Sequence, residues 1–477
     1  MKNRNITRNL ESVWSYYMEC DVVVIGAGPG GLFAASKLAR DFKVIVIDKG
    51  RGIERRMCIS LKNGTCKKCS PCNITGGLGG AGGLSDGKLN LRPDIGGNLE
   101  EFVSHDEAWE IIDEIDKFFL RHGAPDELYA PSEEDIAEIL RKSAASGIKF
   151  IPIVQRHMGS DKTPSIINSI KEEIEGKGAK FLLETKVMDI IADKSVKGVV
   201  VKENNKNEFE IKCKYIIAAP GRVGAYWLSD QLKKLKIPVK YNPVDIGVRV
   251  EIPEILMEHI TKIEWDPKFH IITKTYDDFV RTFCTCPRGF VVEEVYDGFV
   301  GVNGHSMREK VSSNTNFAFL VRVELTEPTE NTSAYAFSVA SIANILGSGK
   351  PIIQRLGDLK RGRRSTWKRI KKSYTSPTFK NVVPGDIAMA LPNRLVVNII
   401  EGLEALNKVI PGVDSDSTLL YAPEIKLYAM RAEVDHRMKT RVEGLYLVGD
   451  GAGVSRGIVG AAATGIIAAN DVLRLSG

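Results

Sequence analysis

The stretch from Val22 to Gly50, VVVIGAGPGGLFAASKLARDFKVIVIDKG, constrains the fold more than any other part of the chain. It begins with four apolar residues of high β propensity, which predict a buried strand. Three glycines follow in the pattern GxGxxG, at Gly26, Gly28 and Gly31. The first permits a tight turn, the second lets the backbone approach a pyrophosphate, and the third lets the next helix pack closely on the strand.

A helix and a second strand complete this unit. Leu32 to Arg40 predicts a helix whose N-terminal amides and dipole would face phosphate groups. Val44 to Ile47 predicts a second strand, which ends in Asp48. This carboxylate lies 22 residues after Gly26, where a βαβ unit places the acceptor for a ribose hydroxyl. A simple glycine-rich turn is the alternative, but strand, glycines, helix, strand and acid in this register favour a dinucleotide site.

Length and composition set wider bounds. A chain of 477 residues predicts two or three domains with ample core. The net charge of +6 is mild and does not by itself imply a nucleic acid or a membrane partner. We find no run of about 18 apolar residues, and the first twenty residues lack the apolar centre of a signal peptide. We therefore expect a cytoplasmic protein with no membrane span, in which residues 1–20 form an N-terminal extension.

Four of the eight cysteines lie in one short segment, at Cys58, Cys66, Cys69 and Cys72. Four thiolates this close can bind one metal centre, and the last three resemble the ligand run of a ferredoxin-type iron-sulfur site. Tetrahedral zinc is a second interpretation, and a redox disulfide is a third. Reduced cysteines in a loop remain the structural alternative.

A glycine-rich block follows the cysteines at residues 76–83. It contains a second formal GxGxxG, but no strand precedes it, so it does not predict a second dinucleotide site. A loop whose bare backbone passes close to a flat ligand is the better interpretation. Polar contacts to that ligand would come from Ser85, Asp86 and Lys88.

The predicted secondary structure changes twice in the middle of the chain. Residues 100–147 predict covering helices through Trp109 and Leu140, and Thr163 predicts a helix N-cap. An antiparallel meander then leads to a strand that ends in Ala219-Pro220-Gly221. Residues 225–420 predict a β-rich substrate or cap domain with an antiparallel sheet.

Two features of this β-rich part are candidates for function. Cys284 and Cys286 lie two apart on a predicted strand, so they should face the same way, toward substrate or into the core. Residues 360–372 hold eight basic residues in thirteen. This run predicts a solvated helix face, with docking of an acidic electron carrier or an anionic substrate as the alternative.

The chain closes on a strand that runs into Gly449-Asp450, followed by a helix start of small residues from Gly457 and Ile458. Small residues let a flavin approach the helix N-terminus, whose dipole stabilises negative charge on the reduced ring. Asp450 would accept a hydrogen bond from the ribityl chain. A Gly/Ala helix packed on the sheet is the structural alternative.

Several stretches together resemble a known family. IGAGPGGLFAA at 25–35, GGAGGLSDGKLN at 79–90, RTFCTCPRGFVV at 281–292 and GLYLVGDGAGVSRGIVGAAATG at 444–465 are similar to FAD-dependent oxidoreductases of the glutathione-reductase-like flavoprotein superfamily. More narrowly, they resemble a little-characterised group of prokaryotic FAD-dependent dehydrogenases. LGDLKRGRRST at 356–366 and APEIKLYAMR at 422–431 add to this resemblance.

The resemblance implies an α/β fold: a Rossmann-like FAD/NAD(P)-binding domain of three layers (ββα), formed by 21–224 and 421–477, and an inserted mixed, β-rich substrate or cap domain at 225–420. It implies FAD as cofactor. The expected FAD-binding residues are Gly26, Gly28, Pro29, Gly30, Gly31, Asp48, Lys49, Gly79, Gly80, Ser85, Asp86, Lys88, Val187, Ala219, Gly221, Gly449, Asp450, Gly457 and Ile458. Asp48 stands where the family more often has Glu.

The function that we expect is FAD-dependent transfer of hydride or electrons between a small organic substrate and an electron carrier, either NAD(P)H or an acidic protein such as ferredoxin. Candidate catalytic side chains are Lys88, Cys284, Cys286 and His305. A prenyl-type saturase of hydrophobic unsaturated substrates is one alternative. A non-catalytic flavoprotein sensor or RNA-associated flavoprotein is another.

Overall fold

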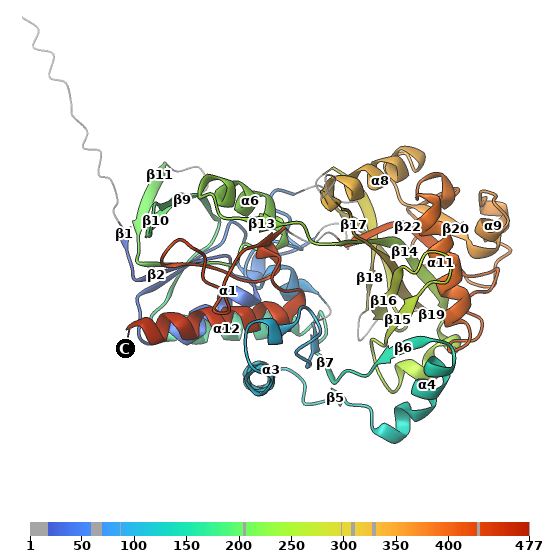
Figure 1. Cartoon of the computed structure of the whole chain (residues 1–477), viewed down its shortest axis with the longest axis horizontal. Helices are drawn as coiled ribbons and strands as arrows, with labels where there is room; N and C mark the ends of the chain where they lie inside the picture. Colours follow the sequence, from blue (N-terminus) through green and yellow to red (C-terminus); the bar gives the residue numbers. More distant parts are fainter. Residues whose placement is uncertain are drawn as a thin grey trace, which may run out of the picture.

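A parallel sheet of five strands carries the predicted dinucleotide unit (Figure 1). The computed structural model of the chain describes residues 18–476 except 59–68, 86, 204–206, 297, 307–310, 327–330 and 427–429. All four neighbouring strand pairs of the sheet are parallel. In spatial order the strands are β24 (Leu445–Leu447), β12 (Tyr215–Ala218), β2 (Val22–Ile25), β3 (Val44–Ile47) and β8 (Lys180–Leu182). Both strands predicted for the βαβ unit, β2 and β3, are confirmed.

Helices cover one face of this sheet and a second sheet covers the other (Figure 1). The helices are α1 (Pro29–Leu38), α3 (His105–Arg121), α5 (Thr163–Gly176) and α12 (Gly457–Ser476). The second sheet has the order β1 (Met18–Glu19), β11 (Glu208–Lys212), β10 (Val196–Glu203) and β9 (Thr185–Ala192). The predicted mixed α/β fold with a parallel sheet is confirmed.

An eight-stranded sheet forms the other half of the molecule. Its neighbouring strands are antiparallel apart from the edge pair β20 and β21. The strands are β21 (Val383–Pro384), β20 (Ile352–Arg355), β22 (Leu419–Lys426), β14 (Val244–Pro253), β19 (Asn314–Val323), β16 (Phe279–Cys286), β15 (Lys268–Ile272) and β6 (Ile148–Ile151). The antiparallel sheet predicted for this part of the chain is therefore confirmed.

Helices and small sheets surround these layers. The remaining helices are α4 (Glu133–Ala145), α6 (Ala225–Lys234), α7 (Glu258–Thr261), α8 (Thr332–Leu346), α9 (Leu356–Lys360), α10 (Trp367–Ile370) and α11 (Asn393–Leu406). The small sheets are β13 (Val239–Lys240) with β23 (Arg431–Ala432), β17 (Phe290–Val295) with β18 (Val300–His305), and β4 (Lys88–Asn90), β7 (Gln155–His157) and β5 (Leu128–Tyr129). Single 3-10 turns are η1 (Ile53–Arg55), η2 (Gly80–Leu84), η3 (Leu99–Glu101), η4 (Arg222–Gly224), η5 (Glu254–Leu256), η6 (Ile387–Met389) and η7 (Asp450–Ala452).

Two main hydrophobic cores, one beneath each large sheet, show how the chain is divided. The helix α6 packs into the first core, although it lies beyond the predicted boundary at residue 225. The helix α4 and the strand β6 pack into the second core, although they lie within the first predicted domain. The chain therefore passes from one half of the molecule to the other more often than the predicted domain boundaries imply.

The covering helices predicted within residues 100–147 are confirmed as α3 and α4, although Trp109 and Leu140 are 43% and 38% exposed. Two local predictions are wrong. Thr163 is the first residue of α5 and does not cap it, because its hydroxyl donates to the carbonyl of Gly159. Residues 360–372 do not form one helix, because α9 ends at Lys360 and α10 spans only Trp367–Ile370.

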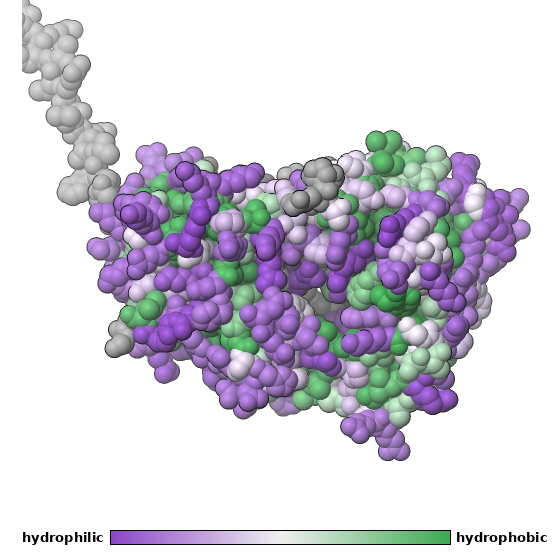
Figure 2. Space-filling view, in the orientation of Figure 1, coloured by the Kyte–Doolittle hydropathy of each residue, from purple (hydrophilic) through white to green (hydrophobic). Residues whose placement is uncertain are grey.

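The surface view shows a mainly hydrophilic face with separate apolar patches, one of them over α8 (Figure 2). Within the described residues, α12 alone has the length and apolar composition of a membrane span. That property has a structural explanation, because 72% of its apolar window is buried inside the protein. It packs as a core helix against α1.

Candidate functional site

A cavity of about 320 Å³ opens where the two halves meet. Its first wall comes from the carboxyl ends of β2, β3, β12 and β24, the edge at which open α/β sheets bind ligands. Its second wall comes from the eight-stranded sheet, through Phe283 and Cys284 of β16 and Lys268 of β15. Both halves of the molecule are thus needed to form the cavity.

The glycine turn after β2 has the geometry that a closely approaching ligand requires. Gly26 has a φ of +100°, and a Cβ there would lie 2.1 Å from the carbonyl oxygen of Ala219. A Cβ at Gly31 would lie 2.0 Å from the carbonyl oxygen of Gly26, so this glycine allows α1 to pack tightly. Gly28 differs, because a Cβ there would meet nothing nearer than Gly80 Cα at 3.7 Å. Gly28 lines the cavity and precedes α1 without any side-chain cap, which leaves the amides of the first helical turn facing a ligand.

Asp48 lies beside this turn at the end of β3. Its Oδ2 accepts a hydrogen bond from Ala27 N at 2.9 Å, and its Oδ1 accepts one from Gly50 N at 2.8 Å. Two backbone amides therefore fix the carboxylate at the cavity wall. Each oxygen retains a lone pair for a further donor, such as a ribose hydroxyl.

Arg56 holds the glycine-rich loop in place. The side chain is 4% exposed and donates to the carbonyls of Asn73 at 2.9 Å and of Ile74 and Gly80 at 2.7 Å, and also to that of Leu78. Burial lowers the pKa of Arg56 to about 10, so the side chain is a cation at neutral pH. The loop is therefore an ordered wall of the cavity.

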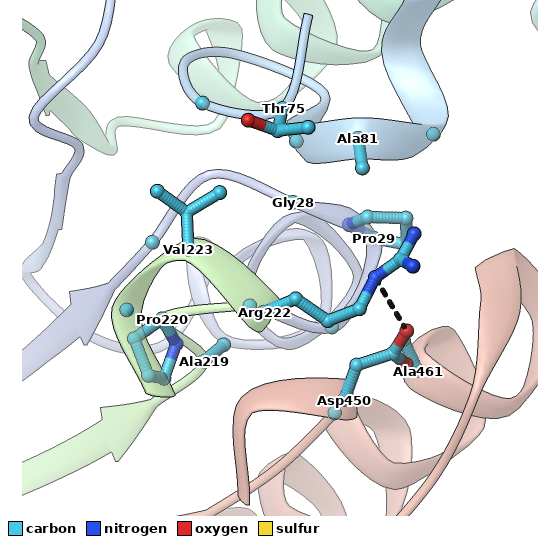
Figure 3. A pocket seen from close by; sticks show the side chains of 18 of the residues that line it. Gly28, Pro29, Thr75, Ala81, Ala219, Pro220, Arg222, Val223, Asp450 and Ala461 are labelled. Carbon is cyan, nitrogen blue, oxygen red and sulfur yellow. Dashed lines mark ion pairs between the residues drawn. The ribbon is translucent and has the colours of Figure 1, made fainter. Parts of the chain in front are cut away.

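The opposite wall comes from the turns after β12 and β24. Arg222 extends across the cavity below Gly28 and Pro29 toward Asp450 (Figure 3). Its Nε lies 3.9 Å from Asp450 Oδ2. Asp450 also accepts from Gly457 N at 3.2 Å. Burial raises the pKa of Asp450, and the charge of Arg222 and the bond from Gly457 oppose this rise in part.

A buried charged group lies where the second half reaches the cavity. Lys88, Asp266 and Lys268 have side chains only 8%, 4% and 7% exposed, and all three line the cavity. Asp266 Oδ2 lies 2.5 Å from Lys268 Nζ and 3.7 Å from Lys88 Nζ. Its Oδ1 accepts from Thr285 N at 2.7 Å. Burial raises the pKa of Asp266, but Lys268, Lys88 and the hydrogen bonds outweigh it and bring the value to about 2.

The structure brings most of the expected FAD-binding residues to one cavity. Those in its lining are Gly26, Gly28, Pro29, Gly30, Asp48, Lys49, Gly80, Ser85, Lys88, Val187, Ala219, Gly221, Gly449, Asp450, Gly457 and Ile458. Gly31 and Gly79 lie behind the lining, where Gly79 N donates to the carbonyl of Ala27 at 2.7 Å. Asp86 lies outside the described residues.

The four candidate catalytic residues separate into two pairs. Lys88 and Cys284 line the cavity, whereas Cys286 and His305 do not. The regular strand predicted for the two cysteines is wrong, because the register shifts between Phe283 and Cys286 and Cys284 has a φ of +48°. Cys286 is fully buried, with its thiol 3.3 Å from Arg249 Nη2. Through this bulge only Cys284 reaches the cavity.

The cysteine run is only partly described. Cys58, Cys69 and Cys72 carry free thiols, and Cys66 lies outside the described residues. Among the side chains that the structure places, no three or more His, Cys, Asp or Glu residues are grouped as a metal site requires. A metal bound by Cys58, Cys66, Cys69 and Cys72 therefore stays a prediction.

Sequence reasoning missed four charged residues of the site. Arg222 follows directly on the small-residue turn at the end of β12, so its place beside a ligand site could have been expected. Asp266 and Lys268 stand in WDPKF, where β15 begins at Lys268, and no motif marks them. Arg56 lies in a stretch of several arginines that the sequence does not distinguish. Only the fold brings these residues together.

Comparisons with known proteins match two parts of the chain and, over nearly all of it, one relative. A family model described as "FAD-dependent protein, C-terminal domain-like" matches residues 243–426, and a model of the Thi4 family matches residues 3–53. A Clostridium beijerinckii protein described as uncharacterized is 29% identical over 494 residues, covering 98% of this chain and 83% of that protein. A thiamine thiazole synthase from Archaeoglobus fulgidus is 29% identical over 147 residues, covering 31% of this chain and 42% of that synthase.

Two dehydrogenases are among the solved structures that align with this chain. L-proline dehydrogenase from P. horikoshii aligns with a TM-score of 0.41 and 13% identity, over 96% of this chain and 94% of that one. 3-Ketosteroid-Δ4-(5α)-dehydrogenase from Rhodococcus jostii RHA1 aligns with a TM-score of 0.43 and 12% identity, over 97% and 99%. Residues 243–426, which include most of the eight-stranded sheet, are thus similar to the C-terminal domain of FAD-dependent proteins.

Proposed function

We propose that this protein is an FAD-dependent oxidoreductase of the glutathione-reductase-like superfamily that acts on a small organic substrate. One observation carries the proposal: a single cavity joins the glycine turn and Asp48 to residues from the part of the chain that matches FAD-dependent proteins. The first set suits a dinucleotide. The second set closes the cavity at Lys268, Phe283 and Cys284.

The chain's own residues fit this cofactor. Gly28 leaves space for a diphosphate beside the amides of α1, and Asp48 offers carboxylate oxygens to a ribose. Arg222 extends its guanidinium into the same cavity, where it would neutralise a diphosphate (Figure 3). Gly457 and Ile458 begin α12 at the cavity, and the helix dipole there favours negative charge. Bound FAD would supply hydride or electron transfer, and the chain positions it and excludes water.

Two observations separate the alternatives. The buried charges of Lys88, Asp266 and Lys268 favour a polar substrate over the hydrophobic substrate of a prenyl-type saturase. Within the basic run, Lys360 pairs with Glu404 and Asp414, and Arg361 pairs with Asp416. These internal ion pairs reduce the charge that the run can offer to RNA or to an acidic electron carrier. Both NAD(P)H and a carrier protein remain candidate electron partners.

Purification and FAD titration test the proposal. We expect the protein to carry flavin absorbance, or to gain it stoichiometrically when FAD is added. Gly28→Ala should lower FAD affinity at least tenfold, because its methyl group enters the cavity without meeting protein atoms closer than 3.7 Å. Gly176→Ala is the matched control, since it adds a methyl group on α5 with nothing within 4 Å. Absence of flavin binding by the intact protein would refute the proposal.

A further inference from the structure

Cys284 and Cys286 of β16 lie together at the second wall of the cavity. Their side chains are joined by a hydrogen bond, and neither cysteine is in a disulfide in the structure. A regular strand spaces the Cα atoms of residues i and i+2 about 6.4–6.8 Å apart, at the upper end of the range that a disulfide spans. Here the strand is not regular, because Cys284 has a φ of +48° and the register shifts after Phe283. The two thiols therefore meet at a local departure from strand geometry.

Only one of the two sulfur atoms is accessible from the cavity. Cys284 is half-buried and lines the cavity together with Phe283 and Lys268. Cys286 is 0% exposed and is not part of the lining. The chain is closely packed around it, since a Cβ at Gly289 would lie 2.7 Å from the Cβ of Cys286. A ligand in the cavity can contact Cys284, and electrons from Cys286 would pass through Cys284.

Arg249 of β14 contacts both cysteines from the protein interior. It is 0% exposed, and its Nη2 donates to the carbonyl of Cys284 at 2.7 Å and lies 3.3 Å from Cys286 Sγ. Asn316 Oδ1 accepts from its Nε at 2.8 Å, and Glu424 Oε1 lies 3.2 Å from its Nη1. Burial lowers the pKa of Arg249, but Glu424 and the two cysteines outweigh burial and raise it above its ordinary value. A fixed cation beside sulfur stabilises the thiolate that forms when a thiol loses its proton.

We propose that Cys284 and Cys286 form a redox pair that exchanges two electrons with FAD in the cavity. The inference rests on the proposed function, because FAD is the oxidant. In the oxidation of the pair, both S–H bonds break and one S–S bond forms, and the two electrons and two protons convert FAD to FADH2. The reverse step breaks the S–S bond and restores both thiols.

Both cysteines can be followed on a single peptide. Trypsin cleaves after Arg281 and Arg288, and the peptide between them, TFCTCPR, contains Cys284 and Cys286 and no other cysteine. A disulfide between them lowers the mass of this peptide by two hydrogens and blocks alkylation of both residues. In the full-length protein as purified, the thiol oxidant diamide should form this disulfide, because the thiols are already in contact. This measurement tests the pair without reference to FAD.

Electron exchange with FAD is tested anaerobically in both directions. Reduced protein receives one equivalent of FAD, and protein with the preformed disulfide receives photoreduced FAD. In at least one direction we expect the flavin absorbance and the mass of the TFCTCPR peptide to change together, with one disulfide for each FAD. Cys286→Ser should abolish this exchange. Cys213→Ser, which changes a buried cysteine outside the cavity lining, should leave it intact.

The outcomes distinguish the redox pair from the proposed function. Absence of FAD binding would refute the proposed function and, with it, the exchange with FAD. FAD binding without a change of the peptide in either direction would retain the cofactor and refute the redox pair. A peptide that keeps both thiols under diamide would also refute the pair, whether or not FAD binds. If Cys286→Ser does not fold, the peptide mass of the wild-type protein still decides.

Discussion

Glu264 shows most clearly how burial alone sets the chemistry of a side chain in this protein. It follows α7, is fully buried, and burial raises its pKa to about 9 from an ordinary value of 4.5. The folded protein therefore keeps it protonated where the unfolded chain has lost the proton. Its contribution to stability is complete below about pH 4.5 and is lost as pH rises toward 9.

Glu264→Gln should remove this dependence. Between pH 5 and pH 8 we expect the free energy of unfolding of the wild type to fall, relative to the variant, by about 1.4 kcal/mol for each pH unit. Urea unfolding at several pH values measures the difference. Glu258→Gln is the control, because Lys262 lowers the pKa of Glu258 and the carboxylate is ionised throughout this range. A constant difference between wild type and Glu264→Gln would contradict the assigned protonation state.

The cysteine run is tested by metal removal. If Cys58, Cys66, Cys69 and Cys72 bind iron-sulfur or zinc, anaerobically purified protein should contain iron with sulfide, or zinc, and each Cys→Ala variant should lose it. Chelation should then release the metal without releasing flavin, since none of the three described cysteines of the run, Cys58, Cys69 and Cys72, lines the cavity. Protein free of iron, sulfide and zinc would refute both metal hypotheses.

At the scale of single residues, the sequence predicts those site residues whose role depends on neighbours close by in the chain. Gly26, Gly28 and Asp48 follow from the register of one βαβ unit, whose parts lie within thirty residues of one another. Asp266 and Lys268 could not be predicted, because their role depends on β15 lying against the cavity of the other half. The different positions of Cys284, in the cavity lining, and Cys286, outside it, could not be predicted for another reason: a bulge replaces the regular alternation on which the expectation was based.

At the scale of elements, the contact between α1 and α12 holds the first half together. A Cβ at Gly465 of α12 would lie 2.1 Å from the carbonyl oxygen of Gly30 in α1. The two helices can approach this closely only because Gly465 has no side chain. Since Gly30 lines the cavity, displacement of α12 would also move the cavity wall.

We expect Gly465→Ala to destabilise the protein by about 1–3 kcal/mol, because the added methyl group forces the helices apart. The affinity for FAD should fall in parallel. Gly176→Ala, on α5 with open space around it, should be neutral or stabilising by up to about 1 kcal/mol. Urea unfolding and FAD titration of both variants measure these effects. Equal stability of the two variants would show that the helices can separate without cost.

The elements that could be predicted from the sequence are those with a strong local pattern of apolar residues. The parallel strands β2, β3 and β12 are continuous apolar runs, and α3 and α5 have one apolar face each. The basic run was misread as one helix, because its charges pair across loops, with Arg363 and Arg369 both near Asp358. Such pairs are set by tertiary structure and leave no periodic pattern.

At the scale of the whole molecule, the cavity couples the two halves. A ligand that fills it would contact the carboxyl ends of the parallel sheet and also β15 and β16 of the other sheet. Binding to the folded state alone would stabilise the protein by about 2.7 kcal/mol at a ligand concentration one hundred times the Kd. Because the ligand contacts both halves, we expect it to stabilise both of them against unfolding.

Amide hydrogen exchange tests the coupling. FAD should slow exchange both in residues 76–83 of the first half and in residues 281–286 of the second. Adenosine, which can occupy only the nucleotide end beside Asp48, should protect the first segment and leave the second unchanged. Protection confined to the first half with FAD would show that the cofactor does not reach the eight-stranded sheet.

The packing of α12 against α1 has a consequence for synthesis on the ribosome. The strand β2 and its glycine turn are made early, yet β24, Asp450 and α12 of the same cavity come from residues 445–476. Until those residues emerge, the apolar face of α1 that contains Gly30 has no partner. We therefore expect a nascent chain to depend on chaperones late into translation, and to acquire its cofactor only after elongation has passed α12.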